Sequence, residues 1–325
     1  MSEITCIGIL VADLVGRPID RFPEKGKLML VPEMELHAGG CAHNTGVDLK
    51  KLGEEVKVVG KVGRDGLGEF MINSLRAHGI DAGGISEDDE HHTSATMVIV
   101  DGQGERTFLH YPGANRGLRE KDIEDSFLSG SQIVHIAGSF LMPGFDGAET
   151  ARVLERAKNL GALTSLDTAW DDTGKWLSTI EPALSYIDIF LSNRDEAHHI
   201  SGKTNLPDIA RFFMDYGIKV VAIKMGEEGS FIMTEEEKVL VPPFSVIAVD
   251  GTGAGDAFCA GFLVGYLRGW DLYETGRLPM LVELCVLEKW EPPKEWEAWK
   301  KLWLLLKRLK EKEAVGEKRD TIWSG

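Results

Sequence analysis

Residues 248–262 read AVDGTGAGDAFCAGF and hold four glycines and two aspartates. They follow the apolar run VPPFSVIAV (241–249) and lead into AFCAGFLVGYL (257–267), which has the character of a helix. A glycine-rich turn that enters a helix directs several backbone N–H groups, and the positive end of the helix dipole, at one point. We therefore expect Gly253, Ala254 and Gly255 to form an anion hole that suits a phosphate or a developing negative charge.

Asp256 falls in the first turn of the expected helix. An aspartate at this position commonly does no more than cap the helix. Beside an anion hole, its carboxylate can also accept a proton from an attacking hydroxyl. The turn is not a Walker loop, because no Gly-Lys-Ser/Thr follows it, and its place near the C-terminal end of the chain does not suit a dinucleotide fingerprint.

Strand-like runs alternate with segments of helical period along most of the chain, as in ITCIGILV followed by HNTGVDLKKLG and EVKVVGKVG followed by LGEFMINSLRAHGI. This order predicts an α/β fold with a mainly parallel sheet and helices on both faces. Residues 27–36 and 93–111 have strand character without an intervening helix, and DGQG marks a hairpin in the second stretch. We expect them to form a small β lid.

The lid divides the chain in sequence. We assign 1–12, 37–92 and 117–325 to one α/β domain and 13–36 with 93–116 to the lid, and we treat 279–325 as an atypical tail. A chain of 325 residues is longer than the usual ~100–200 of one domain, so one large domain with an insertion and two domains are equally compatible with its length.

The formal net charge is −16, which repels the phosphates of nucleic acids and an anionic membrane surface. Cys6, Cys41, Cys259 and Cys285 are widely spaced and lie in apolar contexts, so we expect buried free thiols and a reducing, cytoplasmic setting. The N-terminal stretch reads as a first strand and not as a signal peptide. No apolar run reaches the ~18 residues of a membrane span.

The stretch DGTGAGDAFCAGF resembles the C-terminal signature of the ribokinase-like carbohydrate kinases, the PfkB family. The resemblance extends in the family's order through AGGCAHNTGVDLKKLG (38–53), VGKVGRDGLGEFM (59–71), GERTFLHYPGAN (104–115), LSNRDEA (191–197) and IKMGEEGSF (223–231), and covers about residues 4–278. It implies a ribokinase-like fold whose β lid closes over the substrate, and transfer of the ATP γ-phosphoryl group to a hydroxyl of a sugar or nucleoside.

The resemblance also implies roles for single residues. Asp256 would be the base that takes the proton from the substrate hydroxyl, and the amides of Gly253, Ala254 and Gly255 would hold the transferring phosphoryl group. The residues implied for the substrate site are Asp13, which we place at the end of the first strand, together with Gly39, Gly40, Asn44 and Asn115.

A second set of residues would hold the nucleotide and its ions. These are Asn193, Glu196, Lys224, Gly226, Gly229 and Thr252 for ATP, Glu196 for Mg²⁺ through water, and Asp250 for a monovalent cation such as K⁺. Most of these residue types also act as ordinary turn or cap residues, so each role depends on the neighbouring matches. Arg106 in the lid can meet an acidic group of the substrate, although an Arg in an exposed hairpin is usually solvated.

Three further expectations concern function and assembly. A nucleoside kinase of the same fold, and a sugar-binding or regulatory homologue that has lost turnover, remain alternatives to a sugar kinase. The unpaired edges of the lid strands need a cover, which a homodimer paired through the lid would provide. The chain also departs from the family in having Gly251 where a Thr or a similar residue is usual.

The largest departure begins at Pro279, where the family continues with a small-residue helix and a glycine turn that line the adenine pocket and complete a monovalent-cation site. Here five of the eight tryptophans fall in the last 36 residues. One explanation is an amphipathic helix, because Trp296, Trp299, Trp303, Leu306 and Leu309 recur at helical spacing. The other explanation is a reading frame displaced by one nucleotide, in which each codon takes the last base of one printed codon and the first two bases of the next. In this frame Met280-Leu281 gives Ala, Trp290-Glu291 and Trp296-Glu297 each give Gly, and Trp299-Lys300 gives Glu. This shifted text resembles the missing segment, so we infer a frameshift.

Resequencing the source gene tests the frameshift. We expect one extra base near Leu278, and its removal should restore nucleotide binding. An uninterrupted frame with these codons would contradict the inference. In that case Asp250 keeps half of a cation site and the adenine pocket lacks one wall, so ATP affinity and activation by potassium should both be poor.

Overall fold

The computed structural model describes residues 3–243 and 253–287. The main sheet confirms the predicted α/β fold, and every neighbouring pair from β5 to β11 is parallel whereas β12 and β13 run antiparallel. In spatial order its strands are β13 (Lys238–Val241), β12 (Ser230–Met233), β11 (Val220–Lys224), β10 (Ile189–Asn193), β9 (Leu163–Thr168), β8 (Ile133–Ser139), β1 (Glu3–Gly8), β4 (Glu55–Gly63) and β5 (Ile85–Asp88).

Helices cover both faces of this sheet, because strand side chains alternate between two apolar cores. In β8, for example, Ile133 and Ala137 belong to one core and Val134 and Ile136 to the other. The first core packs against α1 (Cys41–Lys51), α2 (Gly66–Ala77), α8 (Ala254–Leu267) and α9 (Leu272–Leu287). The second packs against α3 (Asp125–Leu128), α4 (Ala148–Asn159), α5 (Leu177–Leu184), α6 (Arg194–Ser201) and α7 (Leu206–Met214).

Helices α8 and α9 approach each other closely at Gly261. A Cβ atom built on Gly261 would lie 2.7 Å from the Cα atom of Pro279, so only glycine fits there without a shift of the backbone. Helix α9 continues through Pro279 to Leu287. Residues 288–325 lie outside the described part of the chain, and the frameshift therefore stays a prediction.

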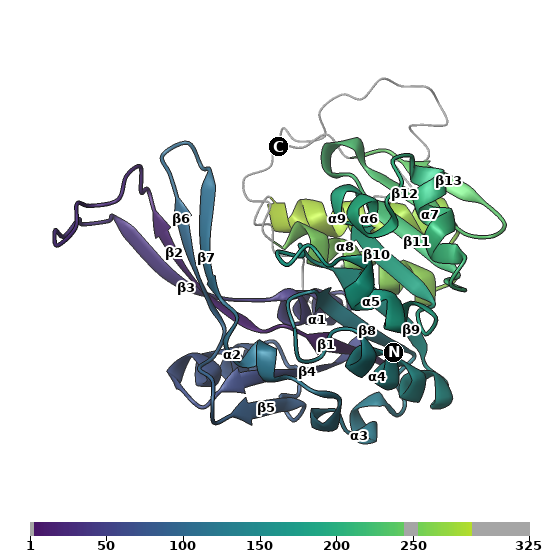
Figure 1. Ribbon diagram of the computed structural model, residues 1–325, viewed down its shortest axis with the longest axis horizontal. Helices are drawn as coiled ribbons and strands as arrows, with labels where there is room; N and C mark the ends of the chain where they lie inside the picture. Colours follow the sequence, from purple (N-terminus) through teal and green to yellow (C-terminus); the bar gives the residue numbers. More distant parts are fainter. Residues whose placement is uncertain (1–2, 244–252, 288–325) are drawn as a thin grey trace.

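A second sheet projects from the main body as a separate arm (Figure 1). It is formed by the two stretches that were expected to make the lid, and the DGQG turn joins β6 to β7 as predicted. Strand character had been expected from residue 27, but β3 begins at Glu33. Its strands, in spatial order, are β3 (Glu33–Gly39), β2 (Val11–Arg17), β6 (Ala95–Val100) and β7 (Arg106–Tyr111).

The prediction that Asp13 ends the first strand is wrong, because β1 ends at Gly8 and Asp13 lies inside lid strand β2. The reason is that the Asn115 side chain forms hydrogen bonds with the backbone N–H and carbonyl groups of Leu10. The Leu10 N–H donates to Asn115 Oδ1 at 3.1 Å, and Asn115 Nδ2 donates to the Leu10 carbonyl at 3.0 Å. The buried amide of Asn115, in the 3-10 turn η1 (Gly113–Gly117), thus takes the place of a neighbouring strand where the chain leaves the main sheet.

The pairing register gives the lid two different faces. Asp13, His37, Thr96 and His110 pair across all four strands and form what we call the polar row. One residue further along, Leu14, Leu36, Met97 and Leu109 pair in the same way and form the apolar row on the opposite face. The side chains of Leu36, Met97 and Leu109 are 41%, 47% and 57% exposed, so the apolar row lies uncovered in the single chain.

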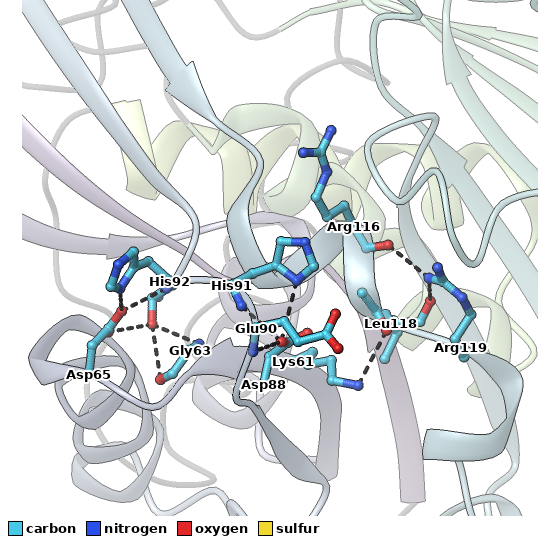
Figure 2. A network of polar contacts seen from close by, with 12 residues as sticks. Lys61, Gly63, Asp65, Asp88, Glu90, His91, His92, Arg116, Leu118 and Arg119 are labelled. Carbon is cyan, nitrogen blue, oxygen red and sulfur yellow. Dashed lines mark hydrogen bonds and ion pairs between the residues drawn. The ribbon is translucent and has the colours of Figure 1, made fainter.

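A polar network joins the main body to the beginning of the lid (Figure 2). Asp65 caps α2, where its Oδ1 atom accepts from the Gly68 N–H at 2.9 Å. The same carboxylate accepts from the Thr93 hydroxyl at 2.7 Å and from the Thr93 N–H at 2.9 Å. Thr93 lies two residues before β6, so a single ionised group fixes both the helix start and the approach to the lid.

We predict that Asp65 makes stability depend on pH. Partial burial raises the pKa of this carboxyl, but the hydrogen bonds from Thr93, Gly68 and His92 outweigh it and lower the pKa from its ordinary value of 3.8 to about 2. The stabilisation is therefore complete above about pH 4 and is lost as the pH falls toward 2. We expect a contribution of about 1 kcal/mol once solvent screening is allowed for.

Urea unfolding between pH 5 and pH 2.5 measures this contribution. The Asp65→Asn variant keeps a capping side chain but cannot ionise, so its free energy of unfolding should fall less steeply with acid than that of the wild type. Asp172→Asn, on an exposed side chain, is the matched control. Identical pH slopes for the wild type and Asp65→Asn would show that Asp65 does not carry the effect.

Candidate active site

The glycine-rich turn of the opening stretch ends in the first residues of α8. Gly253 is the N-cap residue of this helix, with a φ of 80° that favours glycine, and Ala254 begins the helix. The Ala257 N–H donates to the Gly253 carbonyl at 2.8 Å, and the N–H groups before it have no partner one turn back in the helix. The structure thus gathers the expected anion-hole residues Gly253, Ala254 and Gly255 at the positive end of a 14-residue helix.

A cavity of about 310 Å³ opens in front of this helix start. It lies where the carboxyl ends of β9, β10 and β11 meet the first turns of α1 and α8, which is the usual place of a ligand site in a doubly wound sheet. Its lining residues are Cys41, Asp167, Thr168, Asn193, Glu196, Lys224, Gly226, Gly229, Ala254, Gly255, Asp256 and Phe258. Eight of these were expected at a catalytic or nucleotide site from the sequence.

The Asp256 carboxylate faces the cavity from the first turn of α8. Asn44 on α1 donates to its Oδ2 atom from Nδ2 at 2.8 Å. Burial raises the pKa of Asp256, and the Asn44 hydrogen bond and the charge of Lys224 oppose this rise. A carboxylate with a raised pKa is a better proton acceptor than one in water, which suits a general base.

Lys224 ends β11 and extends under the start of α8. Its Nζ atom lies 2.7 Å from Asp167 Oδ1, at the end of β9, and 3.9 Å from Cys259 Sγ on α8. Burial lowers the pKa of Lys224, but the nearby Asp167, Cys259 and Glu196 together raise it above its ordinary value, so the side chain is an ammonium ion. Its side chain is therefore largely buried at the end of the strand.

Asn193 and Glu196 form the start of α6 and share a capping box. Asn193 Oδ1 accepts from the Glu196 N–H at 2.8 Å, and the Glu196 carboxylate accepts from the Thr168 hydroxyl at 2.7 Å. Burial and the nearby Asp167 raise the pKa of Glu196. The capping role that the sequence allowed for this pair is therefore present, and both residues also line the cavity.

Gly39 and Gly40 connect the lid to α1 beside the cavity. The Asp13 carboxylate lies directly against Gly39, where a side chain would displace it. Gly40 has a φ of 91°, and a Cβ atom there would lie 2.5 Å from the Ile9 carbonyl oxygen. Burial raises the pKa of Asp13, whereas the Thr96 hydrogen bond and His37 lower it. The polar row thus reaches the segment that joins the lid to α1.

Two further residues expected at the substrate site, Arg106 and Asn115, do not line this cavity. Arg106 begins β7 at the far end of the lid hairpin, four residues or roughly 13 Å along the strand from His110 of the polar row. The Asn115 amide is occupied by the Leu10 backbone. Thr252 and Asp250, expected at the nucleotide and at the monovalent cation, fall outside the described residues.

Sequence reasoning missed Cys41, Asp167, Thr168 and Phe258, all of which line the cavity. For Asp167 a signal was present, because it ends the run ALTSLD and the carboxyl ends of parallel strands share one edge of the sheet. No comparable signal marked Cys41, although free thiols were expected. Cys6, Cys41 and Cys259 are free in the structure, as predicted.

The described helices include none that is long and apolar enough to cross a membrane. Among proteins of similar sequence, an uncharacterized sugar kinase of Archaeoglobus fulgidus is 32% identical over 243 residues, which are 74% of this chain and 95% of the relative. Two solved structures are also similar. The ribokinase of Thermotoga maritima is 26% identical with a TM-score of 0.73, covering 88% of this chain and 92% of its own. An uncharacterized sugar kinase of Pyrococcus horikoshii in complex with ATP is 28% identical with a TM-score of 0.71, covering 90% and 96%.

The sequence pattern of the pfkB family carbohydrate kinases matches residues 1–289, which is most of the chain. This match spans the strands and helices that build the cavity, from β1 to α9. It agrees with the resemblance drawn from the residues around Asp256, Asn44 and Asn193. The chain belongs to the pfkB family of carbohydrate kinases.

Proposed function

We propose that this protein phosphorylates a hydroxyl group of a sugar or sugar-like small molecule and uses ATP as the phosphoryl donor. One observation carries the proposal: Asp256 lines a cavity directly beside the N–H groups at the start of α8, which have no partner one turn back in the helix. A base and an anion hole at one point are the two parts that transfer of a phosphoryl group to an alcohol requires.

In the proposed reaction the acceptor hydroxyl oxygen attacks the γ-phosphorus of ATP. Its proton passes to the Asp256 carboxylate, the bond between the γ-phosphorus and the β–γ bridging oxygen breaks, and ADP leaves with the electron pair. The amides of Gly253, Ala254 and Gly255 stabilise the charge on the transferred oxygens. Asp256 then releases the proton to solvent, so the base is regenerated.

The nucleotide would lie along the carboxyl ends of β10 and β11. Asn193, Glu196, Gly226 and Gly229 line the cavity there, and Thr252 would join them. The buried carboxyl of Glu196 suits a hydrated Mg²⁺, because Mg²⁺ keeps most of its water ligands and accepts one or two carboxylates. When bound, this ion would neutralise phosphate charge. A potassium site that includes Asp250 belongs to the same proposal.

The acceptor would lie between the base of the lid and α1. Asp13 and the rest of the polar row offer partners for several hydroxyl groups, and Gly39 and Gly40 let a ligand approach the backbone. In the described state, Asn44 donates to Asp256 and can orient the base as well as bind a hydroxyl. Roles for Arg106 and Asn115 in binding the acceptor stay predictions.

An assay of ADP release over a panel of sugars, nucleosides and aldonates tests the activity. We expect turnover with at least one sugar or sugar acid. Asp256→Asn should then reduce kcat by about 100-fold or more while leaving acceptor binding nearly unchanged, because it removes the base and preserves the shape. Asp172→Asn is the matched control and should retain full activity. If the folded wild-type protein releases no ADP with any compound of the panel, this result would count against a kinase.

We also propose a homodimer that forms through the lid. The lid projects from the body as an arm (Figure 1). The apolar row is exposed on one of its faces. A two-fold pairing of two lids would bury both rows and cover the strand edges.

Light scattering at micromolar concentration tests the dimer. The wild type should have the mass of two chains, and Met97→Lys should shift the mass toward one chain because it places a charge in the apolar row. Leu240→Lys changes another exposed apolar side chain, on β13 and far from the lid, and should leave the dimer intact. A monomeric wild type would rule the dimer out.

A further inference from the structure

The cavity wall has an unequal distribution of charge. Among the described residues that line it, Lys224 has the only cationic side chain, whereas Asp167, Glu196 and Asp256 have carboxyl groups. A polyphosphate ligand would add further negative charge to this space. The position and hydrogen-bonding capacity of one ammonium group therefore matter more here than in a site with several cations.

The Lys224 ammonium lies against the anion hole. A Cβ atom built on Gly255 would be 3.4 Å from Nζ, so the charge sits beside the first turn of α8. Its side chain keeps 14% of its surface exposed, whereas that of Asp167 keeps 4%. The Lys224 side chain thus extends into the cavity while it is held by the buried Asp167 carboxylate.

One N–H donor of the ammonium group has no hydrogen-bond partner among the described residues. It carries three N–H groups, of which one bonds to Asp167 Oδ1 and a second approaches the weak acceptor Cys259 Sγ. The third has no partner among the described residues. A phosphoryl oxygen in the anion hole would accept from it, in addition to the backbone amides.

These contacts point to a role beyond general nucleotide binding. We propose that Lys224 is a catalytic residue that contacts the transferred phosphoryl group, and that Asp167 is the positioning residue that holds its ammonium against the start of α8. The inference rests on the proposed phosphoryl transfer and adds the positive charge of Lys224 to the groups that stabilise its transition state. In the step written above, Lys224 offsets the charge on the oxygens of the transferring group and exchanges no proton.

The same ammonium acts on the base. Lys224 lowers the pKa of Asp256, which burial raises, and so favours the ionised carboxylate. Among the other groups near this carboxylate, the hydrogen bond from Cys41 also lowers the pKa of Asp256, whereas the Asp48 carboxylate raises it. The titratable groups that face Asp256 are Cys6 on β1, Cys41 and Asp48 on α1, Asp167 on β9, Lys224 on β11 and Cys259 on α8.

The first experiment removes the lysine. Lys224→Ala should lower kcat by about 100-fold or more and change the KM of the acceptor little, because the contact strengthens in the transition state. Lys203→Ala, on an exposed side chain, is the matched control and should behave as wild type. Nearly unchanged kcat in Lys224→Ala would overturn the proposal.

A second measurement separates catalysis from a purely structural ion pair. In saturating potassium, methylammonium chloride should partly restore the kcat of Lys224→Ala, whereas tetramethylammonium chloride at the same ionic strength should not. The acidic limb of the kcat/KM profile should also move to higher pH in Lys224→Ala, since Asp256 loses the neighbour that lowers its pKa. Loss of activity with no amine rescue and an unmoved limb would show a structural role only.

Asp167→Asn tests the positioning role. Its kcat should fall while the amine has no effect, because the lysine is still present but is no longer held against α8. The melting temperature of each variant is compared with that of wild type, so that loss of folding is not read as loss of catalysis. An Asp167→Asn variant with wild-type kcat would overturn this part of the proposal.

A binding experiment distinguishes failure of this proposal from failure of the proposed function. Calorimetry compares Mg²⁺·ADP alone with Mg²⁺·ADP and beryllium fluoride, which mimics the γ-phosphoryl group. The wild type should bind the mimic more tightly than ADP, and Lys224→Ala should lose that preference but keep its affinity for ADP. If both proteins prefer the beryllium fluoride complex over ADP to the same extent, the Lys224 assignment is overturned, whether or not any acceptor is phosphorylated. The assay of ADP release with the acceptor panel tests only the proposed function.

Discussion

The Asp256 carboxyl group lies partly buried among groups with opposite effects on its ionisation, and the site is arranged around this balance. Burial alone raises the pKa of Asp256 and favours its neutral form. The first turn of α8, the Asn44 amide and the Lys224 ammonium each favour the anion. They come from three different elements, so the protonation state of one side chain depends on how β11, α1 and α8 pack together.

The carboxyl-end edge of the main sheet explains how these groups meet. Asp167, Asn193 and Lys224 end or nearly end three neighbouring parallel strands, which places them along one edge although 57 residues separate the first from the last. Because α1 and α8 cover the same face of the sheet, their first turns bring Asn44 and Asp256 to that edge. A parallel sheet thus collects polar groups that are distant in sequence without the need for a dedicated loop.

The sequence predicted the fold class, the lid and eight of the cavity residues, because these depend on local patterns and on the family resemblance. Periodicity could not show where the chain leaves the main sheet, and the placement of Asp13 failed for that reason. That exit depends on the side chain of Asn115, which contacts Leu10 from 105 positions away. The Lys224–Asp167 ion pair could not be predicted for the same reason, because the run VVAIK does not show which carboxylate lies beside its last residue. Thr252, Asp250 and the tail beyond Leu287 remain predictions, because they lie outside the part of the chain that the structure describes.

The two rows of the lid have a consequence for how such a protein can change. Asp13 of the polar row and Leu14 of the apolar row are adjacent in sequence, yet their side chains lie on opposite faces of the arm. Substitutions at odd positions of β2 therefore alter a different surface from substitutions at even positions. A substitution can therefore change the contacts of one face of the lid while those of the other face are conserved.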